Sequence, residues 1–445
     1  MDKHASPKVL LIQPPVYDFA LYDLFLRPYG LLRIGAWFAD SGYDVALLDC
    51  LDWNEPATVR SLGRVKRKPD GTGKFHMTSV PFPVISDGLR RRYHRYGILR
   101  EVIKRRIAQS QADIVCVTTG MTYWYPGVAE VLDIIHDVLP RALIFIGGIY
   151  ATLMPEHLGS LDADVHIVQG NAAETLSSVL NRAGFPVPVH PVPTFPHTCS
   201  SVWKHAAVLR LSEGCPLNCD YCASRVLSPK FLPGNPQAAA AWLADLHHLH
   251  GVRNVAFYDD ALLVDTQRIL VPFLQAVIKE KLPIRFYTPN GVHITHIDGA
   301  TAALMKQAGF QELRMGFESS SDQFHSQHDR KCTKEAFHSA VAAAHASGFS
   351  LNQLRVYVLA GIPGQLKDEV EQSVRYAGEA GVRVSIAEYT PVPGTALWDE
   401  SCRRSKFPLA DEPLYHNNTL QPLSWSGLSR DDMQDLKQLA SKAGS

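Results

Sequence analysis

The chain has 445 residues, of which 46% are hydrophobic, so its length predicts two or three domains at roughly 150 residues each. Its 44 lysines and arginines balance 44 aspartates and glutamates, which argues against nucleic acid or an anionic membrane as the dominant partner. No apolar run approaches the ~18 residues of a spanning helix, and the N-terminal apolar run is too short for a secretory signal. We therefore expect a cytoplasmic protein without a membrane span.

The first 200 residues alternate short β-branched runs with helical stretches, a pattern typical of an α/β domain with a parallel sheet. Polar loops follow these runs, at the strand ends where open α/β sheets bind ligands. The fold class predicted for residues 1–200 is a doubly wound, Rossmann-like domain. Its five predicted strands cover residues 8–13, 44–49, 113–119, 142–148 and 164–170.

A basic insertion of residues 53–110 separates the second and third predicted strands. Between Arg60 and Arg106 there are 14 lysines and arginines but 3 aspartates and glutamates, a local net charge of +11. We favour a connector helix with solvated charges, as charge runs usually are. A site for phosphate, a cofactor tail or an acidic substrate is the next interpretation, and an RNA site is the least favoured.

A second α/β series follows the Pro-rich connector at residues 186–197. Helical segments separate six predicted strands, so we expect a partial (β/α)6 barrel over residues 201–400 with its chemistry at the carboxyl ends of the strands. Residues 401–445 are expected to form a helical tail, with Ser429 as N-cap and Gly444 as C-cap. The six strands are predicted at residues 207–212, 254–259, 283–288, 312–317, 354–360 and 382–389.

Three cysteines lie close together just after the first strand of this series. Cys215, Cys219 and Cys222 have the spacing C-x3-C-x2-C, which lets one loop wrap three thiols around a metal centre. Three thiolates leave one iron of a four-iron cluster without a protein ligand, as a reactive centre requires. The alternative is a structural zinc site, which needs a fourth ligand such as Cys199 or His205.

With Tyr221 before its third cysteine, the loop resembles the signature of the radical SAM superfamily. The resemblance implies that the cysteines hold a 4Fe-4S cluster, that the free iron binds S-adenosylmethionine (SAM), and that reductive cleavage yields a 5'-deoxyadenosyl radical. An electron donor such as flavodoxin or ferredoxin is implied as a partner. Tight turns or a capped loop would explain several of the matching positions equally well. The residues implied near SAM are Tyr221, Asp259, Asp260, Asn290, Glu318, Gly361 and Gly364.

An α/β domain in front of such a barrel resembles the cobalamin-binding subfamily, and the loops at 147–156 and 169–176 match it best. The loop after the first strand lacks the D-x-H-x-x-G histidine, so the resemblance implies base-off cobalamin without a protein histidine ligand. We take His166 as a structural strand residue. Tyr123 and Trp124 are candidate catalytic residues facing cobalt, or else ordinary helix-start packing. The residues implied around cobalamin are Thr118, Thr119, Met121, Gly147, Gly148, Thr152 and Gly170.

Three functions follow from these interpretations. The leading one is methyl transfer to an unactivated carbon or phosphorus, through a 5'-deoxyadenosyl radical and methylcobalamin. The second is a cobalamin-linked radical oxidoreductase or cyclase. Under either function, cobalamin could instead have been lost from a vestigial domain, because Ile149 or Tyr150 replaces a usual subfamily histidine. The third is a non-catalytic metal or nucleic-acid binding module. The substrate stays open among protein side chains, peptides, lipids and small molecules.

Overall fold

A computed structural model describes residues 6–84, 91–198, 201–203, 206–423 and 427–444. The chain forms two compact units, the first of residues 1–197 and 411–420 and the second of residues 198–410 and 421–445. The first boundary lies near the predicted residue 200, whereas the predicted tail is divided between the two units. Within the described ranges, no helix is long and apolar enough to cross a membrane.

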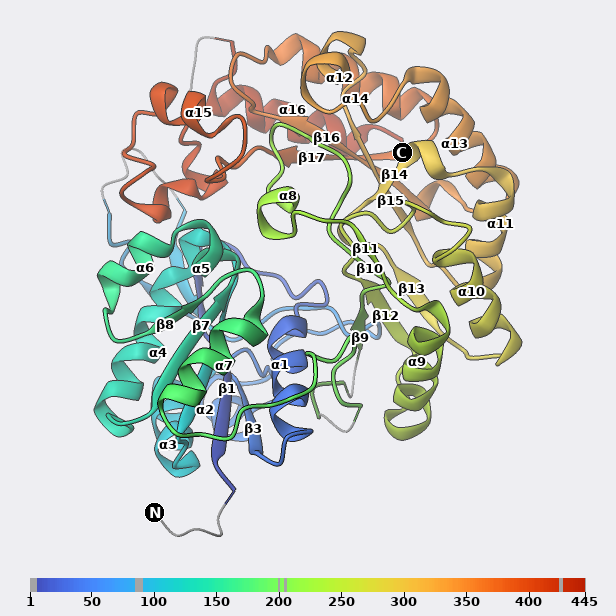
Figure 1. The fold of residues 1–445 in the computed structure, drawn as a ribbon. Coiled ribbons are helices and arrows are strands. Elements are labelled where there is room, and N and C mark those ends of the chain that lie inside the picture. The colour runs from blue at the N-terminus through green and yellow to red at the C-terminus, as the bar shows by residue number, and fades with distance from the viewer. Residues whose placement is uncertain (1–5, 85–90, 199–200, 204–205, 424–426, 445) are drawn as a thin grey trace. The chain divides into compact units, whose positions relative to one another are not determined.

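Unit 1 is built on a five-stranded parallel sheet with the order β3-β1-β6-β7-β8 (Figure 1). All five strands coincide with the predicted runs, so the α/β prediction is confirmed. The strand order reverses between β1 and β6, and ligands of open α/β sheets bind beyond the carboxyl ends at such a point. The strands are β1 (Lys8–Gln13), β3 (Asp44–Asp49), β6 (Ile114–Thr119), β7 (Leu143–Gly148) and β8 (His166–Val168).

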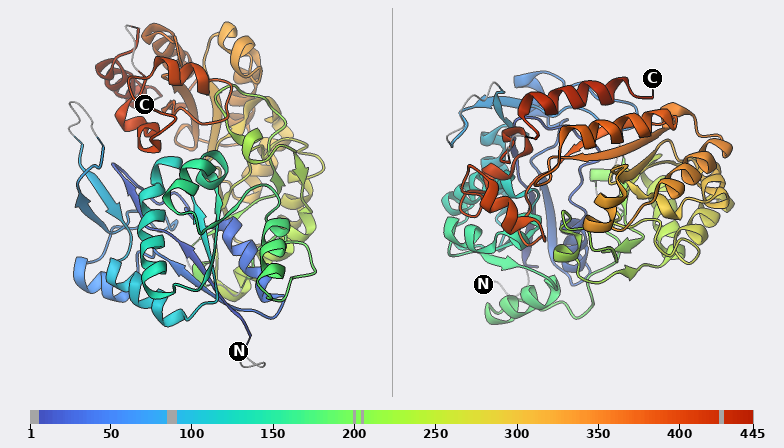
Figure 2. Two further views of the ribbon diagram at one scale, coloured as in Figure 1. Left: turned by 60° about the vertical axis from the view of Figure 1, so that its left-hand side comes forward. Right: turned by 90° about the horizontal axis from the view of Figure 1, so that it is seen from above.

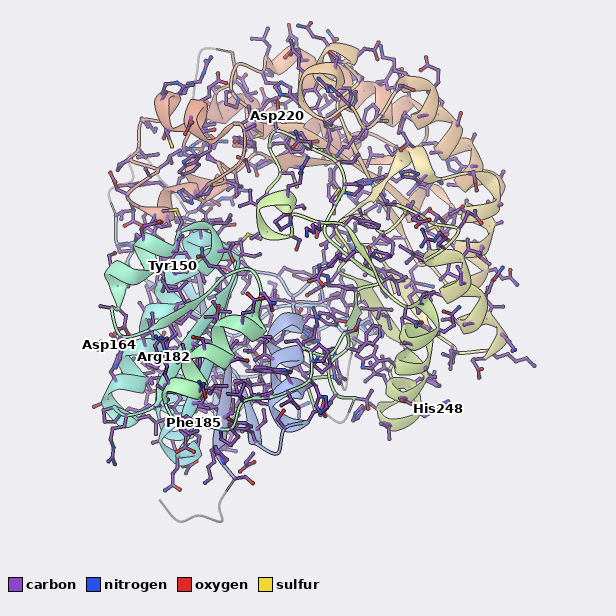
Figure 3. The ribbon with its side chains drawn as sticks, viewed as in Figure 1. Tyr150, Asp164, Arg182, Phe185, Asp220 and His248 are labelled. Atoms are coloured by element: carbon purple, nitrogen blue, oxygen red, sulfur yellow. The ribbon has the colours of Figure 1, made fainter. Side chains whose placement is uncertain are left out.

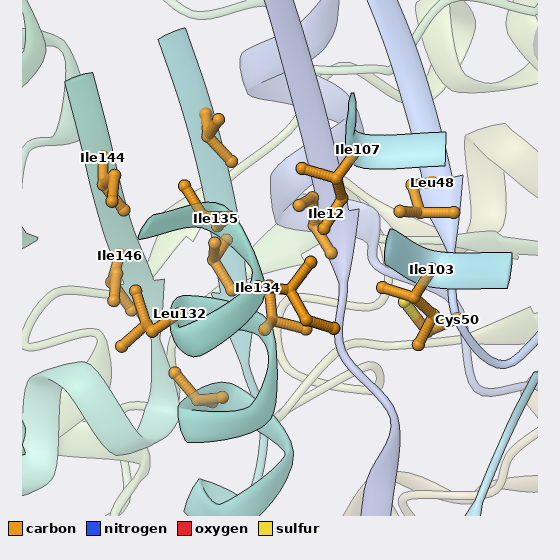
Figure 4. Close-up of a cluster of buried hydrophobic side chains, with 14 of the residues drawn as sticks. Ile12, Leu48, Cys50, Ile103, Ile107, Leu132, Ile134, Ile135, Ile144 and Ile146 are labelled. Atoms are coloured by element: carbon orange, nitrogen blue, oxygen red, sulfur yellow. The ribbon is translucent and has the colours of Figure 1, made fainter. Parts of the chain in front are cut away.

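Both faces of this sheet are buried, which explains why its strands read as nearly continuous apolar runs. Leu10 and Ile12 of β1 point into a core with α3 (Arg100–Ser110) and α4 (Tyr125–Val138), part of which is shown in Figure 4. Val9 and Leu11 point to the opposite face, where α1 (Tyr29–Ala39) and α7 (Ala172–Arg182) cover the sheet. Two short helices, α5 (Ile149–Leu153) and α6 (Pro155–Leu161), follow β7.

The basic insertion is only in part the expected connector helix. Its last residues form α3 (Arg100–Ser110), which carries four of the basic residues, but it also contains the short helix α2 (Pro56–Leu62) and two strands, β4 (Met77–Val80) and β5 (Tyr93–Tyr96). These strands join β2 (Val16–Asp18) in an antiparallel sheet, of which β4 and β5 are drawn in lighter blue in the left-hand view of Figure 2. Tyr93 and Tyr96 of β5 are buried, so this part of the basic run is folded rather than freely solvated.

Some of its arginines are held in buried ion pairs. Arg95 Nε and Nη2 each donate to a carboxylate oxygen of Glu130 on α4 at 2.7 Å, and the Tyr17 hydroxyl donates to the same carboxylate at 2.8 Å. The Arg95 and Glu130 side chains are 11% and 5% exposed. Burial works to lower the pKa of Arg95, but the hydrogen bonds and charge of Glu130 outweigh it and raise the pKa. The pair therefore fastens the antiparallel sheet to the helical layer of unit 1.

Replacing Glu130 by alanine should destabilise unit 1. The change leaves the buried Arg95 guanidinium and the Tyr17 hydroxyl without their acceptor, and breaking a buried pair costs about 3–5 kcal/mol. We expect this loss in the free energy of unfolding measured with urea. The matched control is Lys104→Ala, which removes the exposed ion pair with Asp137 and should leave the unfolding midpoint near that of the parent. Equal midpoints for the two variants would contradict the assignment.

Unit 2 is a partial (β/α)6 barrel, as predicted. Its parallel strands form a sheet of order β13-β12-β9 and a sheet of order β14-β15-β16-β17. A parallel bridge between Phe286 and Phe310 links the two, so the strands follow one another in chain order. The strands are β9 (Ala207–Leu209), β12 (Asn254–Phe257), β13 (Arg285–Tyr287), β14 (Val292–His293), β15 (Leu313–Glu318), β16 (Leu354–Ala360) and β17 (Arg383–Glu388).

Six helices line the outside of these strands (Figure 1). The last of them begins as predicted: the Ser429 hydroxyl accepts from the Asp432 N–H at 3.2 Å, and the Asp432 carboxylate accepts from the Ser429 N–H at 2.9 Å. This last helix packs on α14 (Lys367–Glu379) and β17. The helices are α9 (Pro236–His250), α10 (Leu270–Lys279), α11 (Gly299–Ala308), α13 (Lys334–Ala346), α14 (Lys367–Glu379) and α16 (Arg430–Lys442).

Candidate functional site

The three predicted cysteines lie in one loop between β10 (Ser212–Glu213) and α8 (Ser224–Leu227). The antiparallel pairing of β10 with β11 (Leu232–Pro233) closes the base of the loop. Gly214 opens it with φ of +77°, and a Cβ atom there would lie 2.4 Å from the carbonyl oxygen of Lys230. Only glycine fits this close approach. All three cysteines are free thiols, and their exposure increases along the loop from Cys215 to Cys222.

The three thiols form a donor set that fits an iron-sulfur cluster, because such a cluster holds its thiolates on different irons. Burial raises the pKa of Cys215, and it raises that of Cys219 to about 12, so ligation must displace protons from these thiols. The proposed fourth zinc ligands, Cys199 and His205, lie outside the described residues.

The loop is also tied to two later parts of unit 2, at His328 after β15 and at Leu397 after β17. The Asp220 N–H donates to the carbonyl of His328 at 2.9 Å, and its carboxylate lies 3.3 Å from His328 Nδ1. The Leu397 N–H donates to the carbonyl of Asp220 at 3.2 Å. Figure 3 labels Asp220 within this loop. The cysteines are therefore carried on backbone that is fixed at both ends and in the middle.

Asp259, predicted to lie near the methionyl part of SAM, holds the entry to the loop. Its carboxylate accepts from the Leu211 N–H at 3.0 and 3.1 Å, and from the N–H and hydroxyl of Ser212 at 2.7 Å each. Burial raises its pKa to about 6, against the lowering effect of these hydrogen bonds. Asp260 is exposed, and its carboxylate accepts from the Ser224 hydroxyl at 3.3 Å. Of the two, Asp260 has the carboxylate with room for a ligand.

Asp259→Ala should destabilise unit 2 and reduce its capacity for iron. It leaves the Leu211 and Ser212 N–H groups buried without an acceptor, at a cost of about 1–3 kcal/mol. We expect this loss in urea unfolding, together with less iron per chain after anaerobic reconstitution. The matched control is Asp260→Ala, which removes the neighbouring exposed carboxylate and should keep the parent's stability and iron content. Parent-like iron loading and stability in Asp259→Ala would refute this role.

Glu318, predicted to approach SAM, ends β15 in an unusual conformation. Its φ is +64°, and the register with β16 shifts between Gly316 and Glu318. The side chain is buried, and its Oε1 accepts from Lys331 Nζ at 2.7 Å. A non-glycine residue at positive φ is strained, and such strain gathers at ligand sites. The carboxylate is thus held at the strand end by a buried ammonium group that the sequence did not single out.

Tyr221 takes part in a polar network beside this pair. Its hydroxyl donates to Asp329 Oδ2 at 2.8 Å, and the other Asp329 oxygen lies 2.8 Å from His325 Nδ1. His325 Nε2 lies 2.8 Å from the carbonyl of Ser319. Burial works to lower the pKa of His325, but the hydrogen bond and charge of Asp329 raise it overall. Tyr221 therefore packs inward, and the structure gives it an anchoring contact.

The other residues predicted near SAM lie at later strand ends. Asn290 is exposed in the turn after β13. Gly361 and Gly364 follow β16 with φ of +102° and +84°. The Gly361 N–H donates to the side-chain oxygen of Gln365 at 2.8 Å, and the amide of Gln365 donates to the carbonyl of Leu359 at 3.0 Å. Gln365 thus shapes this glycine turn.

In unit 1, the predicted residues gather at the carboxyl ends of β6 and β7. The Thr119 hydroxyl donates to the carbonyl of Gly147 at 3.0 Å and accepts from the Ala151 N–H at 3.2 Å, so it joins the two strand ends. Gly148 has φ of +111°, and a Cβ atom there would lie 2.4 Å from the Thr119 carbonyl. This contact leaves Thr119 little freedom to bind a ligand.

The remaining predicted residues of this edge present small or exposed groups. Thr118 and Gly147 are partly buried, Met121 is 43% exposed, and Thr152 donates its hydroxyl to the carbonyl of Gly148 at 2.8 Å. Gly170 follows β8 with φ of +58°. His166 lies within β8, with its ring 5.4 Å from that of Phe145.

Trp124 is held from both sides at the turn η1 (Thr122–Trp124) that precedes α4. Its Nε1 donates to Asp18 Oδ2 at 2.7 Å, and its ring covers Gly120, where a Cβ atom would lie 2.6 Å from the ring. Burial raises the pKa of Asp18, although its hydrogen bonds oppose the rise. Burial likewise raises the pKa of the neighbouring Tyr123. The packing interpretation of Trp124 has direct support in these contacts.

Sequence reasoning missed a strap of residues 411–420 that belongs to unit 1. Asn417 Nδ2 donates to Asp18 Oδ1 at 2.9 Å, and His416 Nδ1 is hydrogen-bonded to the Thr122 hydroxyl at 2.7 Å. The Tyr125 hydroxyl donates to Glu412 at 3.3 Å. The strap therefore contacts the η1 turn from a point some 300 residues later in the chain, and no local pattern in the sequence indicates this.

Two family models match the chain. Residues 209–377 match the Radical SAM superfamily, and residues 84–180 match the B12 binding domain. The first match covers the cysteine loop, Glu318 and Lys331, and the second covers the strand ends of β6, β7 and β8. Both matches fall on the units in which the corresponding predicted residues gather.

Two curated proteins are similar to the chain in sequence. An uncharacterized methyltransferase of Pyrococcus horikoshii is 27% identical over 196 residues, 43% of this chain and 41% of the relative. The anaerobic magnesium-protoporphyrin IX monomethyl ester cyclase of Synechocystis is 22% identical over 350 residues, 71% of this chain and 62% of the relative. The chain thus spans less than two thirds of either curated relative.

The fold resembles two solved structures. The radical S-adenosylmethionine methyltransferase TsrM from Kitasatospora setae, with cobalamin and a [4Fe-4S] cluster bound, superimposes with a TM-score of 0.70 at 14% identity. The match covers 99% of this chain and 92% of that chain. The cobalamin-dependent radical enzyme OxsB gives a TM-score of 0.61 at 14% identity, covering 95% of this chain and 57% of that chain. At these identities the likeness concerns the fold.

Proposed function

We propose that this chain, which belongs to the radical SAM superfamily and carries a B12 binding domain, is a cobalamin-dependent radical SAM methyltransferase acting on an unactivated carbon. The observation that carries the proposal is the loop with three cysteines in the partial barrel of unit 2. The same chain has, in unit 1, a five-stranded parallel sheet that matches the B12 binding domain. Two relatives with methyltransferase names, from Pyrococcus horikoshii and Kitasatospora setae, support this choice.

Unit 2 would hold the cluster and SAM. Cys215, Cys219 and Cys222 would ligate three irons, and the fourth iron would bind SAM. Glu318 and Asp260 have carboxylates at strand ends where they can orient SAM through hydrogen bonds. When bound, the cluster supplies the electron that cleaves SAM to a 5'-deoxyadenosyl radical, and cobalamin supplies a carrier for the methyl group. The chain contributes position, orientation and electrostatics.

The cysteine loop acts as a rigid holder in this scheme. Asp259 fixes the backbone before Cys215, and the bonds of Asp220 fix it between Cys219 and Cys222. Lys331 holds the Glu318 carboxylate at the end of β15. Because each group is restrained by buried hydrogen bonds, SAM would meet preformed partners rather than ordering them on binding.

Unit 1 would hold cobalamin at the carboxyl ends of its strands. Thr118, Met121, Gly147, Thr152 and Gly170 offer small or exposed groups there, and close approach to a corrin requires such groups. The loop after β1 contains no histidine, so we propose the base-off form without a protein histidine ligand. Trp124, fixed by Asp18, would serve as a wall of this site, and Tyr123 lies beside it.

The proposal also includes a reducing setting and a one-electron donor. The loop thiols must stay reduced to accept iron, which the cytoplasm favours over secretory compartments. Flavodoxin or ferredoxin would be a suitable donor.

A radical cyclase is the second candidate, favoured by one observation. The relative from Synechocystis named as an anaerobic magnesium-protoporphyrin IX monomethyl ester cyclase aligns with 71% of this chain, more than the 43% aligned with the methyltransferase of Pyrococcus horikoshii. Methyl transfer and ring formation share the radical step but differ in their products. Methyl transfer adds one methylene unit and releases S-adenosylhomocysteine, whereas ring formation yields deoxyadenosine without S-adenosylhomocysteine.

Removal of the thiols should abolish the radical chemistry. After anaerobic reconstitution, the parent chain should contain about four irons and, with SAM and dithionite, form 5'-deoxyadenosine. The variant Cys215→Ala/Cys219→Ala/Cys222→Ala should bind no cluster iron and should form no 5'-deoxyadenosine. The control is Cys402→Ala on α15 (Trp398–Arg404), a thiol outside the loop that should keep both properties. Iron loading of the triple variant, or zinc in place of iron in the parent, would refute the proposal.

A further inference from the structure

We propose that Lys331 is a positioning residue that raises the reduction potential of the cluster held by the cysteine loop. The inference rests on the proposed function, because it concerns the cluster which that function requires. Lys331 carries a charge in the interior of unit 2, with its side chain 10% exposed. Buried lysines are rare unless they are paired, so a role in the protein interior, rather than solubility, accounts for this lysine.

The fold builds a place for this ammonium group. Lys331 Nζ donates to Glu318 Oε1 at 2.7 Å and lies 5.6 Å from the centre of the Tyr221 ring. Gly316 keeps the space open, because a Cβ atom there would lie 3.0 Å from Glu318 Oε1 and 3.3 Å from Lys331 Nζ. The space left by Gly316, the ring face of Tyr221 and the carboxylate of Glu318 therefore surround one cation.

The cation lies beside the cysteine loop. Tyr221, whose ring centre lies 5.6 Å from Lys331 Nζ, stands between Cys219 and Cys222 and directly before Cys222. The second carboxylate nearby, Asp329, is already bonded to Tyr221 and His325. Lys331 therefore holds a positive charge next to the segment that carries two of the proposed cluster ligands.

The sign of the effect on reduction follows from charge. Thiolate ligands give a bound cluster negative charge, and one-electron reduction adds to it. A fixed positive charge nearby favours the reduced form, and it acts strongly where little water screens it. Removing the charge should therefore lower the potential, whereas removing the carboxylate that offsets it should raise the potential. The two changes have opposite signs, which a merely structural role for the pair would not produce.

The test is an anaerobic redox titration, followed by electron paramagnetic resonance, on the reconstituted full chain without SAM. For Lys331→Gln we expect the equilibrium constant for reduction to fall at least tenfold, which is 59 mV for one electron. Lys331→Arg should stay near the parent, and Glu318→Gln should shift the potential upward. The matched control is Lys334→Gln, because Lys334 is a nearby exposed lysine whose loss should leave the potential unchanged.

The outcomes separate this inference from the proposed function. A parent potential in Lys331→Gln, with weaker SAM binding by equilibrium dialysis, would assign the lysine to SAM and overturn the inference while leaving the function intact. If Lys331→Gln fails to load iron, a Glu318→Gln potential equal to or below that of the parent overturns the inference. A parent chain that assembles no cluster overturns the proposed function, and the inference falls with it.

Discussion

The carboxylate of Asp259 accepts hydrogen bonds from Leu211 and Ser212 at the point where β9 leads into the cysteine loop. Every thiol of the loop depends on this contact, because it fixes the direction in which the chain leaves the barrel. Unit 1 has an equivalent in Asp18, which binds Trp124 and Asn417 and thereby fixes the η1 turn at the end of β6. A buried carboxylate must be satisfied, so each one imposes a defined geometry on the backbone and side chains around it.

The regular elements could be predicted wherever the sequence pattern was local. β1 and β16 match their predicted runs residue for residue, because both runs are rich in the apolar and β-branched residues that mark strands in a sequence. β9 is shorter than predicted, since the chain turns where Asp259 captures Leu211 and Ser212. The antiparallel sheet of the basic insertion was missed because β5 pairs with β2, some 75 residues earlier, and no short window contains that pairing.

The candidate site divides in the same way. The three cysteines were predictable because their chemistry depends on spacing within eight residues. Lys331 was not, because its significance comes from burial and from contacts with Glu318 and Tyr221 on other elements. His416 and Asn417 belong to a strap that returns to unit 1 from the far end of the chain. Residues of this kind acquire a role only when the fold brings distant segments together, which explains why composition and periodicity gave no sign of them.

In the proposed reaction, one chain joins radical formation at the cysteine loop to methyl transfer from the cobalamin site. This reaction can be tested by anaerobic incubation of the reconstituted holoenzyme with methyl-labelled SAM, a reductant and an extract of candidate substrates, followed by mass spectrometry. We expect a labelled product one methylene unit heavier than its precursor, formed together with S-adenosylhomocysteine and 5'-deoxyadenosine. Deoxyadenosine formed without S-adenosylhomocysteine or labelled product would rule out the proposed methyl transfer.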